Sequence, residues 1–260
     1  MNSQKTPAPR DASGGSSVKS ALRTLQILEV FSEARQPLAL SELARRMDAP
    51  KSSTLALVET LTERGYLFRS KQGSYYPTGR WLGHARRIAE HDPVAAQVHA
   101  SLERLRDRIG ETAIDAVLAG DQSIYLDVVE STELIRFSAR IGDVKPLHSS
   151  ASGRALLGTL DDAACKDIVA RLPFDGAART SARTKAQQLL RTIGEERERG
   201  WSANIGEHRP DVISVAAGVD INGTAHALVI AAPFNRVSKR VDEIGAILQR
   251  EAQDLLSSFR

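Results

Sequence analysis

The stretch that decides the fold is APKSSTLALVETLTERGYL, residues 49–67. Its apolar residues Leu55, Val58 and Leu61 recur at the spacing of one helix face, and Gly65 ends the run. Small hydroxyl residues at the start of a helix satisfy free backbone N–H groups, and the same hydroxyls can donate to phosphate oxygens. Three such residues open this helix: Ser52, Ser53 and Thr54. We therefore expect caps first, with the same atoms available to a nucleic acid.

The segments on either side complete a recognisable arrangement. Upstream, an apolar stripe that includes Leu22 and Leu25 predicts a helix, and LALSELARRMDA (38–49) predicts a short second helix with Ser41 as its N-cap. Downstream, YLFRSKQGSYYP (66–77) predicts two short strands around a Lys-Gln-Gly turn. Helix, short helix, turn, helix and hairpin is the order of a winged helix-turn-helix. In such a module the second helix of the pair enters the major groove by its N-terminal end.

The charge of the chain is unevenly distributed. Residues 1–90 carry 14 Lys and Arg against 8 Asp and Glu, whereas the remainder carries 21 against 24. A basic N-terminal part indicates a polyanionic partner and favours double-stranded DNA over the alternative of a helical domain that binds another protein. The candidate DNA-binding residues are Ser41, Lys51, Ser52, Ser53, Thr54, Ala56, Thr60, Arg64, Arg69 and Lys71.

A connecting helix is predicted over TGRWLGHARRIAE, residues 78–90. Its apolar residues recur on one face of an otherwise basic helix: Trp81, Leu82, Ala85, Ile88 and Ala89. An apolar stripe on a linker predicts contact with a second copy of the chain in a homodimer. The alternative is that the stripe packs on its own domain.

From residue 92 onward the pattern predicts an α+β domain. Asp92-Pro93 marks a helix start and Gly110 its end, and a final amphipathic helix begins near Val237. Further helices are expected near 151–171 and 184–199. The absence of alternation between strands and helices predicts an antiparallel sheet with helices segregated on its faces. Strands are predicted at 112–119, 123–131, 134–142, 200–207, 212–221 and 225–234.

The chain resembles the IclR family of bacterial transcription regulators. GDVKPLHSSASGRALLGTL (142–160) is similar to the effector-domain motif of that family, and residues 38–67 are similar to its helix-turn-helix. The resemblance implies a winged helix-turn-helix, a linker helix and a GAF-like effector-binding domain, in a homodimer or dimer of dimers. The expected boundaries are a disordered, Pro/Gly/Ser-rich tail at 1–17, then 18–77, 78–91 and 92–260.

An effector site is expected where the helix after Pro-Leu-His begins. Ser150, Ala151, Ser152 and Gly153 leave room for a ligand oxygen, and the positive end of a helix favours a carboxylate. The alternative is that these small residues only let the helix pack tightly. His148 lies beside this site and is a further candidate for contact with the effector, or with a metal. The resemblance adds four positions to the expected effector site: Glu207, Ser214, Val229 and Ala231.

The chain departs from the family pattern in two places. Ala56 stands where many members have an arginine, so base reading must come from neighbouring residues, from the wing or from DNA shape. Val229 and Ala231 stand where serines are frequent, which makes the site more apolar. We therefore expect a less polar effector than a two- or three-carbon keto acid, such as an aromatic or longer carboxylate.

Other chemistry has no motif in the sequence. Gly-x-Ser-x-Gly, a phosphate-binding Gly-rich loop, Cys-x-x-Cys and His-x-x-x-His are all absent, and Cys165 is the single cysteine. No apolar run approaches the ~18 residues of a membrane span. We expect no catalytic residue, metal, cofactor or membrane, and a cytoplasmic repressor rather than an activator. The rival classes are an enzyme that pairs His148 with Ser149 or Ser152, and a protein–protein adaptor.

Overall fold

The structure, a computed structural model, describes residues 18–174, 179–207 and 209–259. The chain divides into two compact units, Met1–Asp92 and Pro93–Arg260, which are described separately. The predicted tail at 1–17 lies outside the described residues.

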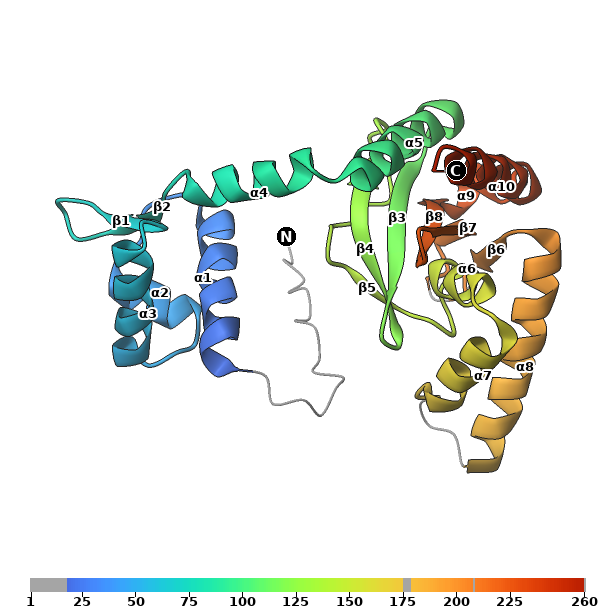
Figure 1. The fold of residues 1–260 in the computed structure, drawn as a ribbon, viewed down its shortest axis with the longest axis horizontal. Helices are drawn as coiled ribbons and strands as arrows, with labels where there is room; N and C mark the ends of the chain where they lie inside the picture. The colour runs from blue at the N-terminus through green and yellow to red at the C-terminus, as the bar shows by residue number, and fades with distance from the viewer. Residues whose placement is uncertain (1–17, 175–178, 208, 260) are drawn as a thin grey trace. The chain divides into compact units, whose positions relative to one another are not determined.

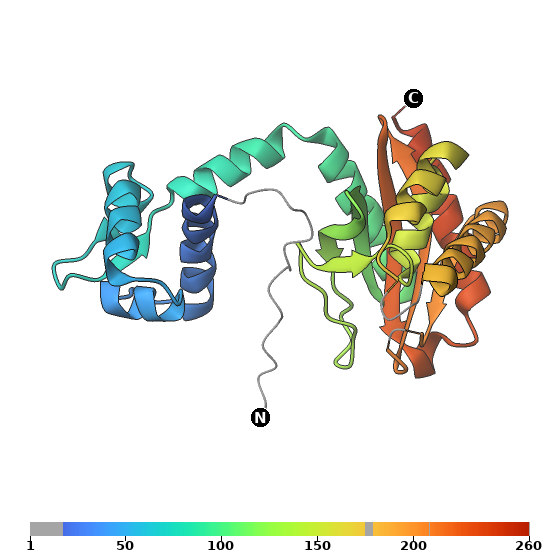
Figure 2. The same ribbon diagram turned by 90° about the horizontal axis from the view of Figure 1, so that it is seen from below.

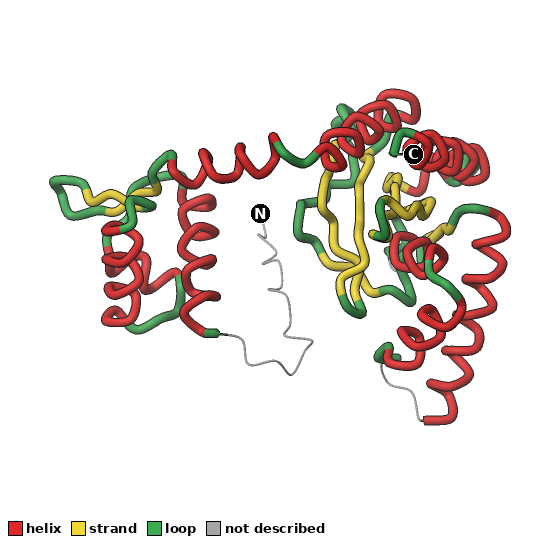
Figure 3. Tube along the Cα trace, in the orientation of Figure 1, coloured by secondary structure: helices red, strands yellow, loops and turns green. Residues whose placement is uncertain are grey.

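The N-terminal unit is helical apart from one hairpin (Figure 3). Its elements are α1 (Lys19–Ala34), α2 (Leu40–Arg46), α3 (Lys51–Glu63), β1 (Leu67–Arg69), β2 (Tyr75–Pro77) and α4 (Arg80–Glu90). A core that includes Ile27, Phe31, Leu43 and Val58 joins the first three helices, and Tyr75 connects it to the hairpin. This is the predicted order of a winged helix-turn-helix.

The helix predicted from the stripe with Leu22 and Leu25 is confirmed as α1, but these two side chains are 44% and 57% exposed, because α1 buries Ile27 and Phe31 instead. The predicted cap of the second helix is wrong. Ser41 is not an N-cap, since α2 begins at Leu40 with Ala39 as the capping residue and no side-chain bond. The preceding Leu38 exchanges two backbone hydrogen bonds with Tyr75 of the wing. This tertiary bridge, rather than a hydroxyl, fixes where the helix starts.

The C-terminal unit is a six-stranded antiparallel sheet in the order β5-β4-β3-β8-β7-β6. In Figure 1, α5 and α10 cover one face and α6, α7 and α8 the other; in Figure 2 the yellow and orange helices lie in front of the sheet. Its elements are α5 (Pro93–Ile109), β3 (Thr112–Ala119), β4 (Gln122–Val129), β5 (Val144–Pro146), α6 (Ala151–Thr159), α7 (Asp162–Arg171), α8 (Arg179–Arg199), β6 (Ser202–Ile205), β7 (Val212–Ile221), β8 (Thr224–Pro233), α9 (Phe234–Val237) and α10 (Val241–Ser257). The predicted α+β class is confirmed.

Strand alternation divides the core into two layers. On β8, Leu228 and Ile230 pack toward α5 and α10, whereas Val229 and Ala231 pack toward α6, α7 and α8. The effector-site positions that the resemblance placed on β8 therefore face the α6 side. No helix within the described residues combines the length and the apolar character that a bilayer span requires.

The strand predicted at 134–142 is absent, and the edge strand is β5 instead. Side chains hold much of this segment, among them Thr112 on the Phe137 carbonyl oxygen, and Gly142 at its end donates its N–H to the Tyr125 carbonyl oxygen of β4. Arg236 donates from Nη1 to the Ile135 carbonyl oxygen at 2.6 Å, while its Nε and Nη2 bind the Glu111 carboxylate. The apolar run that suggested a strand is exposed, with Leu134 97% and Ile135 76% accessible.

Candidate nucleic-acid interface and ligand pocket

The hydroxyls at the start of α3 do not cap free N–H groups as expected. The N-cap residue is Pro50, and no side-chain cap bond is present at this helix end. Instead, Ser53 Oγ and Thr54 Oγ1 both donate to the Pro50 carbonyl oxygen, at 3.0 and 3.1 Å. Thr54 is fully buried, so it has no surface with which to contact DNA. Lys51 and Ser52 are exposed.

An arginine from α1 joins this helix end. Arg23 Nη1 donates to Ser53 Oγ at 3.1 Å, which holds a guanidinium at the N-terminal end of α3. Sequence reasoning missed Arg23 because the two residues are 30 positions apart. The sequence signal for Arg23 was a positively charged residue within the apolar pattern of α1. Arg23 therefore supplies near α3 the cationic group that Ala56 does not.

The remaining candidate residues are spread over the surface of the N-terminal unit. Ala56 and Thr60 are exposed along α3, and Thr60 Oγ1 donates to the Ala56 carbonyl oxygen. Arg64 is the C-cap of α3, about 20 Å along the helix axis from Lys51 at 1.5 Å per residue. The structure therefore brings Arg23, Lys51, Ser52 and Ser53 together and leaves Arg64 at the opposite end of the helix.

The wing and α2 carry the other exposed candidates. Lys71 and Arg69 are exposed on the hairpin, with the Arg69 guanidinium 5.6 Å from the Tyr75 ring centroid. Ser41 is exposed on α2 beside Glu42. Hydrogen bonds from Arg45 and then Arg46 lower the pKa of Glu42 to about 2, so those arginines of α2 are already paired.

The start of α6 is closed by its own packing, contrary to the room expected for a ligand oxygen. Ser150 Oγ accepts from the Gly153 N–H at 2.9 Å and donates to the Pro146 carbonyl oxygen at 2.7 Å. Ser152 is 2% exposed and Ala151 fully buried. A Cβ atom on Gly153 would meet backbone atoms of Leu147, so the small residues serve tight packing.

A hollow of about 990 Å³ lies beside this helix, mainly between α8 and β6. We call it the α8 pocket; its lining includes His148, Arg154, Phe174, Lys185, Ile205 and Glu207. Of the expected effector residues only His148 and Glu207 line it. Ser214 is half-buried on β7, and its strand partner Ala231 and the nearby Val229 are each 1% exposed. The predicted site is therefore divided between this pocket, the start of α6 and the sheet face.

The pocket contains a cation that the sequence reading did not single out. Arg154 is 5% exposed; its Nε lies 3.0 Å from Glu196 Oε2 and its Nη2 donates to the Ala203 carbonyl oxygen. Its Nη1 is 3.6 Å from a carboxylate oxygen of Glu207, whose side chain is 57% exposed. Arg154 is thus bonded to Glu196 and Ala203 on one side and faces an exposed carboxylate on the other. The sequence signal for this cation was the arginine within GRALL (153–157), a segment that also belongs to the family motif.

For the rival enzyme class, the structure shows how one of the two candidate serines, Ser152, is engaged. Ser123 Oγ donates to Ser152 Oγ at 3.0 Å, which engages that hydroxyl inside the core. Within the ranges that the structure describes, no three His, Cys, Asp or Glu side chains are grouped to hold a metal ion.

Comparisons with known proteins agree with the fold. Residues 20–70 match the IclR helix-turn-helix domain, and residues 87–257 match the model described as bacterial transcriptional regulator IclR C-terminal. The probable transcriptional regulator SauR of Cupriavidus necator is 29% identical over 92% of this chain and 96% of its own. The acetate operon repressor of Salmonella typhimurium is 28% identical over 98% and 95%. Both matched families consist of transcription regulators rather than enzymes.

Solved structures share the architecture. The IclR protein of Thermotoga maritima superposes with a TM-score of 0.74 at 20% identity, covering 93% of this chain and 98% of that one. An IclR homolog from Microbacterium hydrocarbonoxydans, complexed with 4-hydroxybenzoate, gives 0.70 at 22% identity, covering 93% and 99%. At these identities the likeness establishes the fold, and the ligand belongs to that neighbour.

Proposed function

This chain belongs to the IclR family of bacterial transcriptional regulators, and we propose that it is a repressor whose operator affinity changes when a carboxylate of aromatic or longer apolar character occupies the α8 pocket. The proposal divides the chain into a DNA-binding domain at 18–77, a linker at 78–91 and an effector domain at 92–260. Several relatives are named repressors, which supports repression as the mode.

The observation that carries the DNA-binding part is the basic, exposed N-terminal end of α3. Lys51 is exposed there, and Arg23 reaches the same end through Ser53. Helix N-termini and cations both favour phosphate, and the small Ser52 side chain permits a close backbone approach. Lys71 on the wing adds a second phosphate contact, one hairpin away from the helix. Ala56 offers no hydrogen bond to a base, so part of the operator preference comes from DNA shape.

The effector part rests on Arg154 and its replaceable partner. The positive and negative charges of the side chains that line the α8 pocket nearly cancel. A ligand carboxylate must therefore replace one of the carboxylates of the pocket itself. Glu207 is the exposed carboxylate on Arg154, and a ligand carboxylate in its place would accept from Nη1. Phe174 and Ile205 supply apolar surface for the rest of the molecule. The 4-hydroxybenzoate bound by a structural neighbour has this chemistry.

The dimer part rests on α4. Trp81, at its start, packs on its own unit, because its Nε1 donates to the Tyr66 carbonyl oxygen at 3.0 Å and the two rings lie 4.5 Å apart. Two turns later Ile88 is 73% exposed, and Leu82 is 54% exposed. Of the expected apolar stripe, Trp81 therefore packs on its own unit, and the remaining residues are exposed: Leu82, Ala85, Ile88 and Ala89. A second copy of α4 is the partner that would bury them.

The DNA-binding proposal is tested by fluorescence anisotropy with DNA from around the chain's own gene, at two salt concentrations. Specific binding that weakens with salt is expected, and Lys51→Ala should reduce the magnitude of the log–log salt slope by about one. Lys166→Ala removes the same charge from the exposed face of α7 and should leave the slope unchanged. Equal slopes for the wild type and Lys51→Ala, or no preference over random competitor, would refute the proposed interface.

The effector proposal is tested by calorimetric titration with 4-hydroxybenzoate and with glyoxylate. We expect the aromatic acid to bind more tightly, and Glu207→Gln to bind it more tightly still, because the competing carboxylate is gone. Glu195→Gln removes another pocket carboxylate that has no ion pair with Arg154 within the described residues, and serves as the control. Preference for glyoxylate alone, or weaker binding by Glu207→Gln, would overturn the assignment.

A further inference from the structure

The outer edge of β7 is open along its second half. β6 pairs with β7 only from Ser202↔Ala216 to Ile205↔Ile213, while β7 continues to Ile221. The chain before β6 turns away at Gly200 into α8. Among the described residues, the last part of β7 therefore has β8 on one side and no strand on the other.

The register shows which backbone groups point out of this edge. Asn222 and Gly223 form a two-residue hairpin with φ of +53° and +82°, so Ile221↔Thr224 is the closing, hydrogen-bonded pair. In an antiparallel ladder the bonding side alternates along the strand. The N–H and C=O of Asp220 and Gly218 consequently point away from β8. The Gly206 N–H donates to the Val212 carbonyl oxygen at 3.2 Å. The backbone carbonyl of Val212 therefore also points away from β8, in the same alternation as Gly218 and Asp220.

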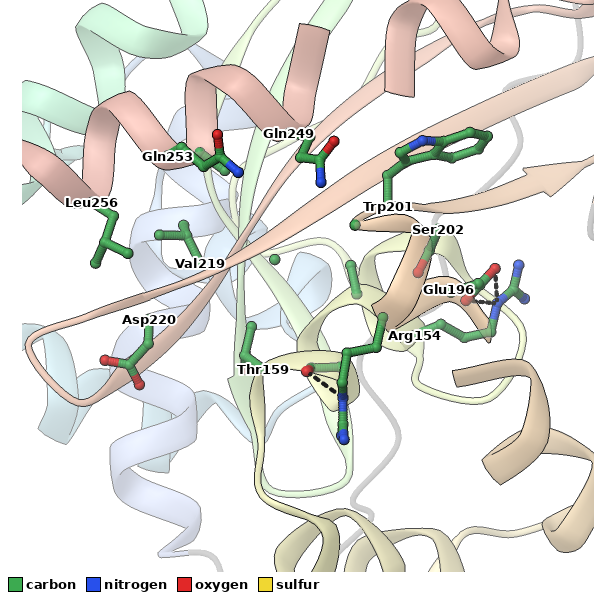
Figure 4. Close-up of a pocket in the computed structure, with 16 residues that line it drawn as sticks. Arg154, Thr159, Glu196, Trp201, Ser202, Val219, Asp220, Gln249, Gln253 and Leu256 are labelled. Carbon is green, nitrogen blue, oxygen red and sulfur yellow. Dashed lines mark hydrogen bonds and ion pairs between the residues drawn. The ribbon is translucent and has the colours of Figure 1, made fainter. Parts of the chain in front are cut away.

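Helices enclose this edge and form a hollow of about 310 Å³, which we call the β7-edge site. Figure 4 shows Gln249 and Gln253 reaching from α10 toward the strand that carries Val219 and Asp220, with Thr159 of α6 on the other side. Gly218 is only half-buried although its missing side chain would collide with the Ala155 carbonyl oxygen. What Gly218 exposes is therefore its backbone.

The charges around the site are already paired. Arg154 is bound to Glu196 and directs its Nη1 at Glu207 in the α8 pocket, and Arg197 donates to Asp162 at 2.8 Å and to the carbonyl oxygen of Gly158. The carboxylate of Asp220 accepts from the Gly223 N–H at 2.9 Å. Within the described part of the chain, no cation at this hollow remains to hold a carboxylate. Its ligand is therefore of a different class from that of the α8 pocket.

The polar groups that remain are amides. Within the described residues neither Gln249 nor Gln253 has a hydrogen-bond partner for its side-chain amide, and each amide offers both donors and an acceptor. The Gly218 backbone offers one N–H and one C=O on the facing wall. An adjacent N–H and C=O on a ligand would match Gly218 as a neighbouring strand does.

We propose that the β7-edge site binds a small uncharged amide, of about nucleobase size, through the outward N–H and C=O of Gly218 and the side chains of Gln249 and Gln253. A volume of about 310 Å³ lies at the lower end of ligand pockets, which sets the size. The site is separate from the α8 pocket but shares Arg154, Glu196 and Trp201 as a wall with it. It does not depend on the proposed DNA interface or on the carboxylate effector.

The test is a titration of the isotope-labelled full chain with uracil, followed by NMR. Uracil presents an adjacent N–H and C=O, whereas 1,3-dimethyluracil has the same ring without an N–H donor. We expect saturable shifts of the Gly218 backbone amide and of both glutamine side-chain amides with uracil, and none with the dimethyl compound. Shifts that are equal for both compounds, or confined to residues of the α8 pocket such as Ile205, would overturn the proposal.

A variant separates the proposed contact from non-specific binding. Gln253→Leu, on the exposed side of α10, should weaken uracil binding roughly fivefold, the effect of losing one neutral hydrogen bond. Gln187→Leu makes the same change on α8, outside both hollows, and should have no effect. Equal affinities for the two variants would refute the role of the glutamine. The uracil titration contains neither DNA nor a carboxylate ligand. Its result can therefore be interpreted even if the proposed repressor function is refuted.

Discussion

Replacing Gly153 by alanine should destabilise the C-terminal unit by about 2–4 kcal/mol. The added Cβ would lie 2.5 Å from the Leu147 carbonyl oxygen and 2.7 Å from its carbonyl carbon, both backbone atoms that cannot rotate away. Overpacking of this kind costs ~1–3 kcal/mol. Moving the helix start also strains the Ser150 cap on the Gly153 N–H, and loss of a cap costs ~1 kcal/mol. Helix propensity favours alanine, but by less than these costs.

The matched control lies five residues later on the same helix. A Cβ on Gly158 would meet nothing within 4 Å, so Gly158→Ala should stabilise the unit by about 0.5–1 kcal/mol. Urea unfolding followed by fluorescence in a Trp81→Phe background leaves Trp201 as the reporter of this unit. A loss below about 0.5 kcal/mol for Gly153→Ala, or equal effects at both glycines, would refute the packing explanation and restore the interpretation of an open ligand cradle.

Three further outcomes are expected. Burial raises the pKa of the Cys165 thiol, so the native chain should react slowly with a thiol reagent such as DTNB and rapidly in urea; equal rates would contradict its buried position. Burial also raises the pKa of Asp115, although His226 opposes this from 3.1 Å. The free energy of unfolding of the wild type, relative to Asp115→Asn, should therefore fall as the pH rises above 3.8, because the folded chain disfavours the ionised carboxylate. Urea unfolding midpoints of both proteins at two pH values test this, and a wild-type advantage that grows with pH would contradict it. In analytical ultracentrifugation we expect the wild type as the proposed dimer or dimer of dimers and Ile88→Glu as a smaller species, whereas an unchanged mass would exclude α4 as the interface.

Periodicity predicted most of the fold because it reports which face of an element is buried. The helices of the N-terminal unit and the long strands β7 and β8 were found this way. Prediction failed where a partner distant in sequence decides the local structure. Leu38 pairs with Tyr75 and sets the start of α2, and Arg236 holds the chain at Ile135 so that no strand forms there.

The candidate site was less predictable, because its key groups act across the fold. Arg23 is placed by its hydrogen bond to Ser53, and Arg154 by its ion pairs with Glu196 and Glu207. The two residues of each pair lie far apart in the sequence. The small residues at the start of α6 were ambiguous between packing and binding. Only the position of Leu147 against Gly153 decides for packing, and composition contains no information on that contact.

The proposed effector can change DNA affinity only if it binds two arrangements of the protein with different affinity. Arg154 shows where such a difference could arise. Its bonds to Glu196 and to the Ala203 carbonyl oxygen tie α6 to α8 and β6. Its contact with Glu207 is the one that a ligand carboxylate would replace, and Glu207 directly follows Gly206 at the end of β6. The first movement would therefore be release of the chain after β6, and Glu207→Gln should reproduce part of the effector response without any ligand. Operator affinity of Glu207→Gln equal to that of the ligand-free wild type would rule this route out.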